Sequence, residues 1–183
     1  MPDTDIDPAF DPALKPALNP IFDSHPPILE TRLWHWNDEA ACANCAAVLA
    51  KKPGVLNAAI ELHGPLGAGK TTFVRHLLRS LGVEGRIKSP TYAVLEPYVC
   101  GGVAISHFDF YRFNDPREWL DAGFRDIYAA PGLKLAEWPA NAAGVLPPAD
   151  LRLHIEVPFD PQGDDQRVVR AEALSALGVA LLR

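Results

Sequence analysis

Residues 64–72 contain a glycine-rich stretch that constrains the fold more than any other part of the sequence. Four residues separate Gly64 from Gly69, and Lys70 and Thr71 follow at once, which is the G-x-x-x-x-G-K-[ST] spacing. The mostly apolar run 55–62 precedes the stretch, and an amphipathic pattern follows it. A strand, a glycine-rich turn and a helix in this order predict a loop whose backbone N–H groups surround a phosphate. The residues expected to bind the nucleotide are Gly64, Pro65, Leu66, Gly67, Ala68, Gly69, Lys70, Thr71 and Thr72.

The last residues of this loop predict the two cofactors, ATP and Mg²⁺. The Lys70 ammonium group is expected to reach the β- and γ-phosphates, and the Thr71 hydroxyl to ligate Mg²⁺. Thr72 is expected to add a further contact. The chain is therefore predicted to bind Mg-ATP.

Two acidic residues follow apolar runs and are candidates for the acid that holds the metal. Asp109 ends the run 103–108, and Glu137 ends the run 133–136. A P-loop site needs such an acid after a buried strand, although strand-end carboxylates are more often only solvated. The predicted metal ligands are Thr71, Glu137 and Asp109. The predicted catalytic residues are Lys70, Thr72, Asp109 and Glu137.

Two further segments allow more than one interpretation. Trp138 follows Glu137 and is predicted to flank the nucleotide or a partner, although aromatic residues are most often packing residues. Ser89-Pro90-Thr91-Tyr92 follows the loop helix and could sense the γ-phosphate as a switch segment. From spacing alone, a plain proline turn is favoured for this segment.

The order of elements predicts an α/β fold, a P-loop NTPase-like three-layer sandwich with a mixed parallel and antiparallel sheet. A first helix after Asn37 or Asp38 is expected to turn Ala41, Cys45, Val48 and Leu49 inward. Further helices are expected after the glycine-rich loop, at Asp115-Pro116 and in the last ten residues. The expected strands are 31–36, 55–62, 93–98, 103–110, 133–137, 151–157 and 167–173.

Composition separates a tail from one domain. Residues 1–28 hold seven prolines, and five aspartates against one lysine, which predicts a disordered acidic tail. Residues 29–183 are then one P-loop ATPase domain, and the formal net charge of the whole chain is −6. No apolar run is long enough to span a bilayer, and the N-terminus lacks a secretory pattern. The expected location is the cytoplasm, away from membranes.

Several motifs together resemble the TsaE (YjeE) family more specifically than the P-loop does alone. They are Gly64–Thr72, Lys88-Ser89-Pro90-Thr91-Tyr92, His107-Phe108-Asp109-Phe110-Tyr111-Arg112, Asp115-Pro116 and Glu137-Trp138-Pro139. Their order and spacing match over about residues 31–173. The resemblance implies a small bacterial P-loop ATPase with a mixed sheet, needed to make N6-threonylcarbamoyladenosine at position 37 of tRNA.

The resemblance also implies partners and residue roles. TsaE proteins act with the TsaD–TsaB pair, so contact with tRNA is expected to be indirect or weak. Carried over by position, Lys70 would meet the phosphates, and Thr71 and Glu137 would meet magnesium. Asp109 and Thr72 would serve hydrolysis, and the segment 89–92 would form the switch. Trp138 would lie near the site or the partner face.

The chain departs from the family pattern at two positions and leaves other functions open. Cys42 stands where many members have a nucleotide-contacting threonine, and Asp164 follows Gly163 where members tend to have arginine, with Arg167 as a substitute. The alternatives are a small-molecule kinase, a GTPase switch and a nucleotide-gated binding module. An arginine-rich lid and an N-K-x-D guanine motif are absent from the sequence, which disfavours the kinase and the GTPase.

Overall fold

The computed structural model describes residues 26–113, 123–158 and 166–183. Most of the acidic tail, the expected helix at Asp115-Pro116 and Asp164 lie outside these residues. The strands are β1 (Glu30–Trp36), β2 (Ala59–His63), β3 (Leu95–Cys100), β4 (Val103–Asp109), β5 (Leu133–Glu137), β6 (Leu151–Glu156) and β7 (Arg167–Ala173). The helices are α1 (Glu39–Ala50), η1 (Val55–Asn57), α2 (Lys70–Ser80), α4 (Phe124–Ala129), η2 (Pro139–Ala142) and α5 (Ala176–Leu182).

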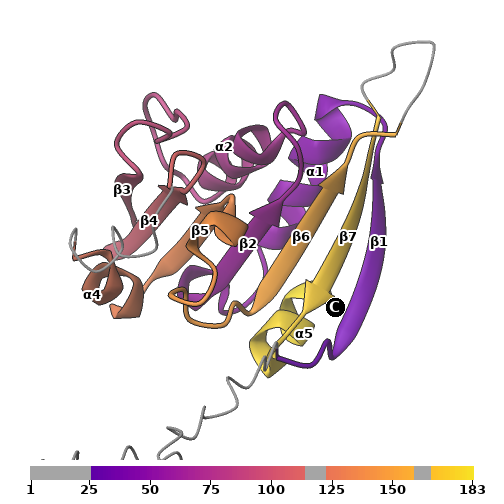
Figure 1. Cartoon of the computed structure of the whole chain (residues 1–183). Coiled ribbons are helices and arrows are strands. Elements are labelled where there is room, and N and C mark those ends of the chain that lie inside the picture. The colour runs from indigo at the N-terminus through magenta and orange to yellow at the C-terminus, as the bar shows by residue number, and fades with distance from the viewer. Residues whose placement is uncertain (1–25, 114–122, 159–165) are drawn as a thin grey trace, which may run out of the picture.

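The strands form one mixed sheet in the order β1-β7-β6-β2-β5-β4-β3 (Figure 1). The central strands β6, β2, β5 and β4 are parallel to their neighbours within this group, whereas β1, β7 and β3 pair antiparallel. Parallel strands covered on a face read as continuous apolar runs, as in β5, which is buried throughout. The α/β class and the mixed sheet predicted from the sequence are therefore confirmed.

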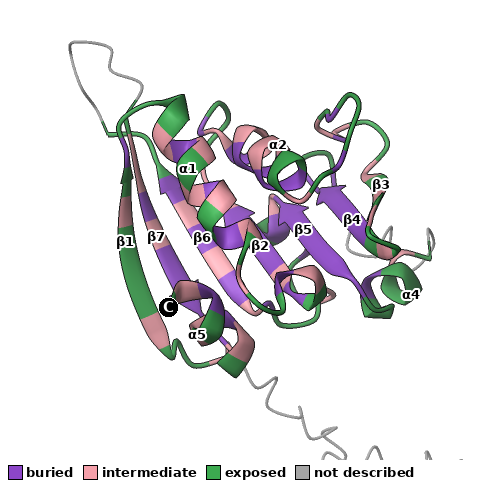
Figure 2. Ribbon diagram, turned by 180° about the vertical axis from the view of Figure 1, so that it is seen from behind, coloured by how far each residue is buried: buried purple, intermediate pink, exposed green. Residues whose placement is uncertain are grey.

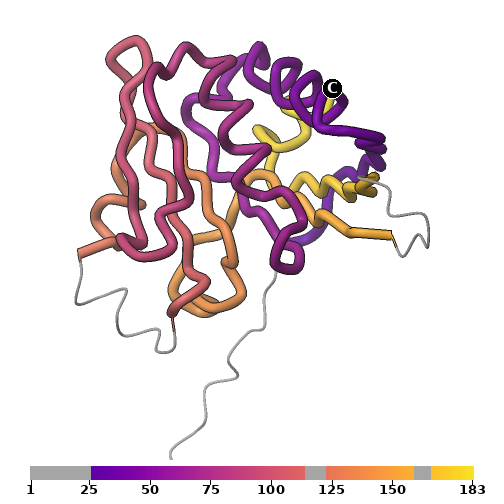
Figure 3. The backbone as a smooth tube through the Cα atoms, turned by 90° about the horizontal axis from the view of Figure 1, so that it is seen from above, coloured from indigo at the N-terminus to yellow at the C-terminus, as the bar shows by residue number. Residues whose placement is uncertain are grey.

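Helices α1 and α2 cover one face of the sheet, as the view from behind shows (Figure 2). Seen from above, these two helices lie side by side along the same side of the strands (Figure 3). The core beneath them contains Trp36, stacked on Phe73 of α2 with ring centroids 5.4 Å apart. Helix α2 begins directly after Gly69 and buries Phe73, Val74, Leu77 and Leu78, which agrees with the amphipathic pattern that follows the loop in the sequence.

The third layer of the sandwich is partial. A second apolar cluster around Phe108, Phe110 and Tyr128 packs α4 and the segment after β5 against the other face of β4 and β5. Over β6 and β7, the described residues place no helix on that face (Figure 1). This part of the sheet instead carries the alternating polar residues of its strands. No helix of the described residues is long and apolar enough to cross a bilayer.

Two local predictions were wrong. The expected strand 55–62 starts at Ala59, because Gly54 has a φ of +84° and the chain first makes the short helix η1. The inner face of α1 consists of Cys42, Ala46 and Leu49, while Val48 is 57% exposed. Helix α1 is capped by Asp38, whose carboxylate accepts a hydrogen bond from the Ala41 amide at 2.7 Å.

Candidate nucleotide site

The glycine-rich loop joins the end of β2 to the start of α2. Gly64, Gly67 and Gly69 have φ values of +145°, +78° and +105°, which residues with side chains rarely adopt. A Cβ on Gly64 would also lie 2.5 Å from the Ile155 carbonyl oxygen. The loop is thus fixed against β6 at its start and leads into the N-terminus of α2, where backbone N–H groups are unpaired.

Lys70 is folded back onto this loop. Its Nζ donates hydrogen bonds to the carbonyl oxygens of Gly64 and Pro65, each at 2.8 Å. The same ammonium group lies 3.9 Å from the ring centroid of Trp138. Burial lowers the pKa of Lys70, and the carboxylates of Glu137 and Asp109 oppose this effect. The side chain therefore rests between the loop carbonyls and an aromatic ring, a position favourable to a cation.

Sheet register brings the two candidate acids together. In the parallel pair β4 and β5, Asp109 lies opposite Glu137, and both side chains are 98% buried. The Thr71 hydroxyl oxygen is 2.9 Å from both carboxylate oxygens of Glu137, to which it donates. The ends of two neighbouring strands and the first turn of α2 thus converge on one place.

Hydroxyl, amide and imidazole groups surround both carboxylates. Asp109 accepts hydrogen bonds from the hydroxyls of Ser89 at 2.5 Å and Thr91 at 2.8 Å, and from the Tyr111 amide at 2.9 Å. His107 Nε2 lies 2.8 Å from Glu137 Oε1. The proline turn 89–92 therefore contacts the predicted site directly.

A cavity of about 320 Å³ opens among these groups. Every residue of the predicted site except Gly64, Pro65 and Ala68 lines it, and Pro65 and Gly64 reach Lys70 through their carbonyls. The lining residues are Leu66, Gly67, Gly69, Lys70, Thr71, Thr72, Ser89, Thr91, Asp109, Tyr111, Glu137 and Trp138. A larger cavity of about 460 Å³ lies between β1, α1 and α5, away from the loop and both acids.

A second, smaller cavity of about 180 Å³ adjoins the loop on the side of α1. Trp36, Asp38, Cys42, Thr72 and Arg167 line it, so Thr72 lies between the two cavities. Arg167 Nε donates to the Ala68 carbonyl at 3.1 Å. Burial, followed by the effects of Cys45 and Glu39, raises the pKa of the Cys42 thiol to about 12, so this group stays neutral.

Sequence reasoning from the residues alone missed the contact between His107 and Glu137, and it favoured a plain turn for the segment that contains Ser89 and Thr91. Strand alternation was the available signal for His107, because residues two apart on a strand share a face and Asp109 was already a candidate. Ser89 and Thr91 gave no such signal, because their contact with Asp109 depends on how the loop 89–94 returns to β4. Val94 ends that loop with a φ of +66°.

The mixed sheet, the glycine-rich turn between β2 and α2, and the paired strand-end acids define a P-loop NTPase-like protein. The family model of the threonylcarbamoyl adenosine biosynthesis protein TsaE matches residues 36–167. The chain belongs to the TsaE family.

Individual proteins agree with this assignment. The tRNA threonylcarbamoyladenosine biosynthesis protein TsaE of Haemophilus influenzae is 40% identical over 119 residues, covering 65% of this chain and 72% of the relative. The protein of the same name from Bacillus subtilis is 32% identical over 146 residues, covering 80% and 86%. The crystal structure of Bacillus subtilis YdiB has the same fold, with a TM-score of 0.64, 23% identity, and coverage of 84% and 92%.

Proposed function

We propose that this chain is the ATP-binding and ATP-hydrolysing subunit that acts with TsaD and TsaB to make N6-threonylcarbamoyladenosine in tRNA. The named relatives from two bacteria support the pathway. The observation that carries the ATPase proposal is the hydrogen bond from Thr71 to Glu137 beside Lys70. A hydroxyl and an acid joined in this way, next to a loop lysine, are the parts that hold Mg-nucleotide in P-loop proteins.

The residues present fit this ligand. The turn from Gly64 to Gly69 leaves room for backbone N–H groups to face phosphate oxygens, and the N-terminus of α2 adds partial positive charge. Thr71, Glu137 and Asp109 offer the oxygen ligands that Mg²⁺ prefers. When bound, Mg²⁺ neutralises charge on the phosphate oxygens. Lys70 and the loop amides would hold the phosphates.

Lys70 must exchange partners to do so. In the ligand-free structure its ammonium donates to two loop carbonyls, and phosphate oxygens would replace these acceptors. Asp109 is the candidate for orienting the attacking water, because it lies in the cavity with hydroxyls of the segment 89–91 on its Oδ2. A change at the γ-phosphate position would thus reach this segment through Asp109.

The cavity beside α1 would take the nucleoside. It adjoins the loop through Gly67, Gly69 and Thr72. Cys42 offers only a neutral thiol there, so the charged side chains able to contact the nucleoside among those that line it are Asp38, Glu39 and Arg167.

Hydrolysis by the isolated chain is expected to be slow. No arginine is among the described residues that line the phosphate cavity, and an arginine at the transition state accelerates related reactions by about 10³–10⁵. TsaD and TsaB are therefore expected to stimulate turnover.

The proposal is tested by measuring phosphate release from Mg-ATP with and without TsaD–TsaB, and tRNA modification by the reconstituted set. The expected result is slow release alone, faster release with the partners, and modification that requires this chain. A Lys70→Ala variant that still supports modification would favour a nucleotide-gated binding module. Phosphoryl transfer to a metabolite faster than hydrolysis would favour a kinase, and equal affinity for GTP and ATP would favour a GTPase.

A further inference from the structure

We propose that His107 is a positioning residue that orients the Glu137 carboxylate for the metal through a hydrogen bond from its Nε2. His107 lies on β4, two residues before Asp109, and its side chain has no exposed surface. Its Nε2 is 2.8 Å from Glu137 Oε1, on β5. The inference rests on the proposed function, because it concerns how the same site holds Mg²⁺.

The hydrogen bond fixes which imidazole nitrogen carries the proton. An ionised carboxylate only accepts hydrogen bonds, so the nitrogen that faces Glu137 must be the donor, Nε2–H. The other nitrogen, Nδ1, is buried and has no hydrogen-bond partner among the described residues. The geometry therefore places a proton on Nε2, the nitrogen that faces Glu137.

Two hydrogen bonds hold the Glu137 carboxylate in place. Glu137 accepts from the Thr71 hydroxyl and from the His107 imidazole. Both hydrogen bonds restrict rotation of the carboxylate, so less freedom is lost when a cation binds. The imidazole thus orients a metal ligand before the metal arrives.

Three substitutions separate this role from simple packing. His107→Leu replaces the imidazole with an apolar side chain of similar volume and so removes the hydrogen-bond donor. His107→Gln supplies an amide nitrogen as far along the side chain as Nε2, whereas the His107→Asn amide reaches only as far as Nδ1. Glutamine can therefore keep the hydrogen bond to Glu137, and asparagine cannot.

The measurement is the Mg²⁺ concentration that gives half of the gain in affinity for a fluorescent ATP analogue, with affinity in EDTA as the reference. Removing partners that orient a metal ligand typically weakens metal binding by about 10–100-fold. We expect His107→Leu and His107→Asn to raise the half-saturating Mg²⁺ concentration about tenfold. His107→Gln should stay within about threefold of the natural protein, and affinity in EDTA should change little in all three.

The outcomes distinguish the proposed function of the chain from the positioning role of His107. If the natural protein binds the analogue without any dependence on Mg²⁺, the proposed function fails. If it depends on Mg²⁺ and His107→Leu has the same half-saturating concentration, only the positioning role of His107 is overturned. Equal loss in the glutamine and asparagine variants would point to packing and would also overturn it.

A second measurement does not depend on variants that fold. In ¹⁵N-histidine-labelled natural protein without nucleotide, NMR should show His107 with a hydrogen on Nε2. A bare Nε2, with the hydrogen on Nδ1 alone, would contradict the proposal.

Discussion

Two groups of buried acids lie on opposite faces of the same sheet, and they differ in the charge of the groups that contact them. At the proposed nucleotide site, Asp109 and Glu137 accept from hydroxyl, amide and imidazole groups and lie near one ammonium group, that of Lys70. On the other face of the sheet, Glu61 and Glu172 contact arginines. Arg152 Nε is 2.8 Å from Glu61, and Arg170 forms an ion pair with Glu172.

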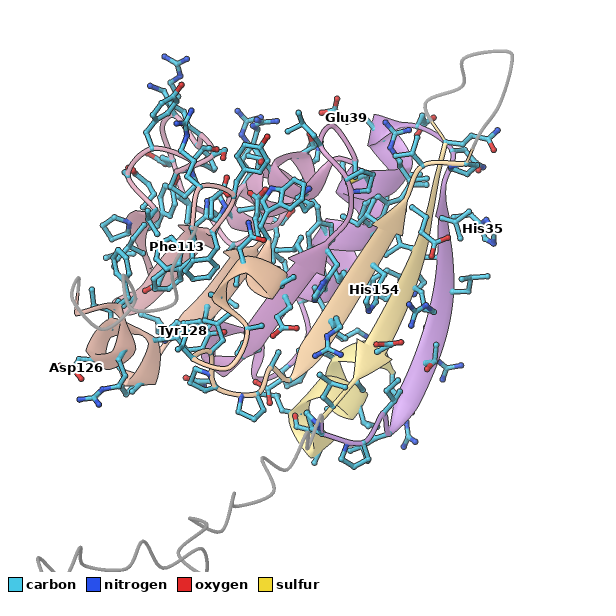
Figure 4. The ribbon with its side chains drawn as sticks, viewed as in Figure 1. His35, Glu39, Phe113, Asp126, Tyr128 and His154 are labelled. Atoms are coloured by element: carbon cyan, nitrogen blue, oxygen red, sulfur yellow. The ribbon has the colours of Figure 1, made fainter. Side chains whose placement is uncertain are left out.

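In the second group, which we call the sheet-face network, each carboxylate has a positively charged partner. It contains Glu61, His63, Arg152, His154, Arg170 and Glu172. The rings of His63 and His154 stack with centroids 4.7 Å apart, and Figure 4 labels His154 on this face. Its two carboxylates are balanced by two guanidinium groups, whereas the site has two carboxylates against one ammonium. The comparison indicates that the network stabilises the fold, whereas the proposed site has more carboxylates than ammonium groups, as a cation site would need.

The largest effect is expected at Lys70. Lys70→Ala should lower the rate of ATP hydrolysis about 10³-fold, because one preorganised donor to a developing charge is worth about 10²–10³. Phosphate release under saturating Mg-ATP measures this. Arg79→Ala, at an exposed position of the same helix, is the matched control and should hydrolyse ATP normally. A Lys70→Ala variant within tenfold of the natural rate would show that the loop lysine is not the main phosphate donor.

Glu172→Gln tests the sheet-face network. The side chain of Glu172 is 3% exposed and that of Arg170 is 42% exposed, so water compensates part of the loss and the free energy of unfolding should fall by about 2 kcal/mol. Urea unfolding measures the loss, and nucleotide affinity should not change. The control is Glu156→Gln, at an exposed position of β6. If Glu172→Gln unfolds like the natural protein, the network does not stabilise the fold.

Glu137→Gln should act in the opposite way. The half-saturating Mg²⁺ concentration should rise at least tenfold, yet the nucleotide-free protein should be no less stable, because a buried charge without a matching cation is removed. Mg²⁺ titration and urea unfolding on one sample give both values. Glu96→Gln, on exposed β3, is the control. A loss of stability as large as that of Glu172→Gln would remove the contrast between the two groups.

The smallest effect is a pH dependence. Burial, then His63, Arg170 and Arg152, lower the pKa of His154 to about 4 from 6.5, and Glu61 opposes this only partly. Between these values the unfolded chain binds a proton that the folded chain does not, so stability falls as pH drops from 6.5 towards 4. The loss should be about 1 kcal/mol, since the ring is partly exposed.

Urea unfolding from pH 7 to pH 4 measures this slope. His154→Gln should flatten it over the same interval, while the remaining slope reports the carboxylates. An unchanged slope in His154→Gln would show that His154 titrates normally in the folded protein.

The sequence was sufficient wherever local pattern and spacing decide the structure. The loop 64–72, helix α2 and the late hairpin of β6 and β7 were predicted close to their observed bounds. The buried face of α1 was not, because Glu39–Ala50 is made mostly of small residues and gives little contrast between faces. The sequence named Asp109 and Glu137 as separate candidates but could not show that they lie side by side. Their pairing is set by the register of β4 and β5, which are distant in the sequence.

The sheet-face network shows a different limit of sequence reasoning. Glu61, Arg152 and Glu172 stand at ordinary alternating strand positions, and such residues usually point to water. The burial of Glu61 and Glu172 follows from the order of β2, β6 and β7 in the sheet, which places Arg152 between them. Nothing in the spacing of these residues along the chain distinguishes them from solvated ones.

The position of Lys70 in the ligand-free chain has a consequence for the thermodynamics of nucleotide capture. Since its ammonium already bridges the first two carbonyls of the loop, the turn is braced before any phosphate arrives. Little backbone entropy then remains to be lost on association. A triphosphate would bind to a loop that already has its bound conformation, and Lys70 would only exchange carbonyl acceptors for phosphate oxygens.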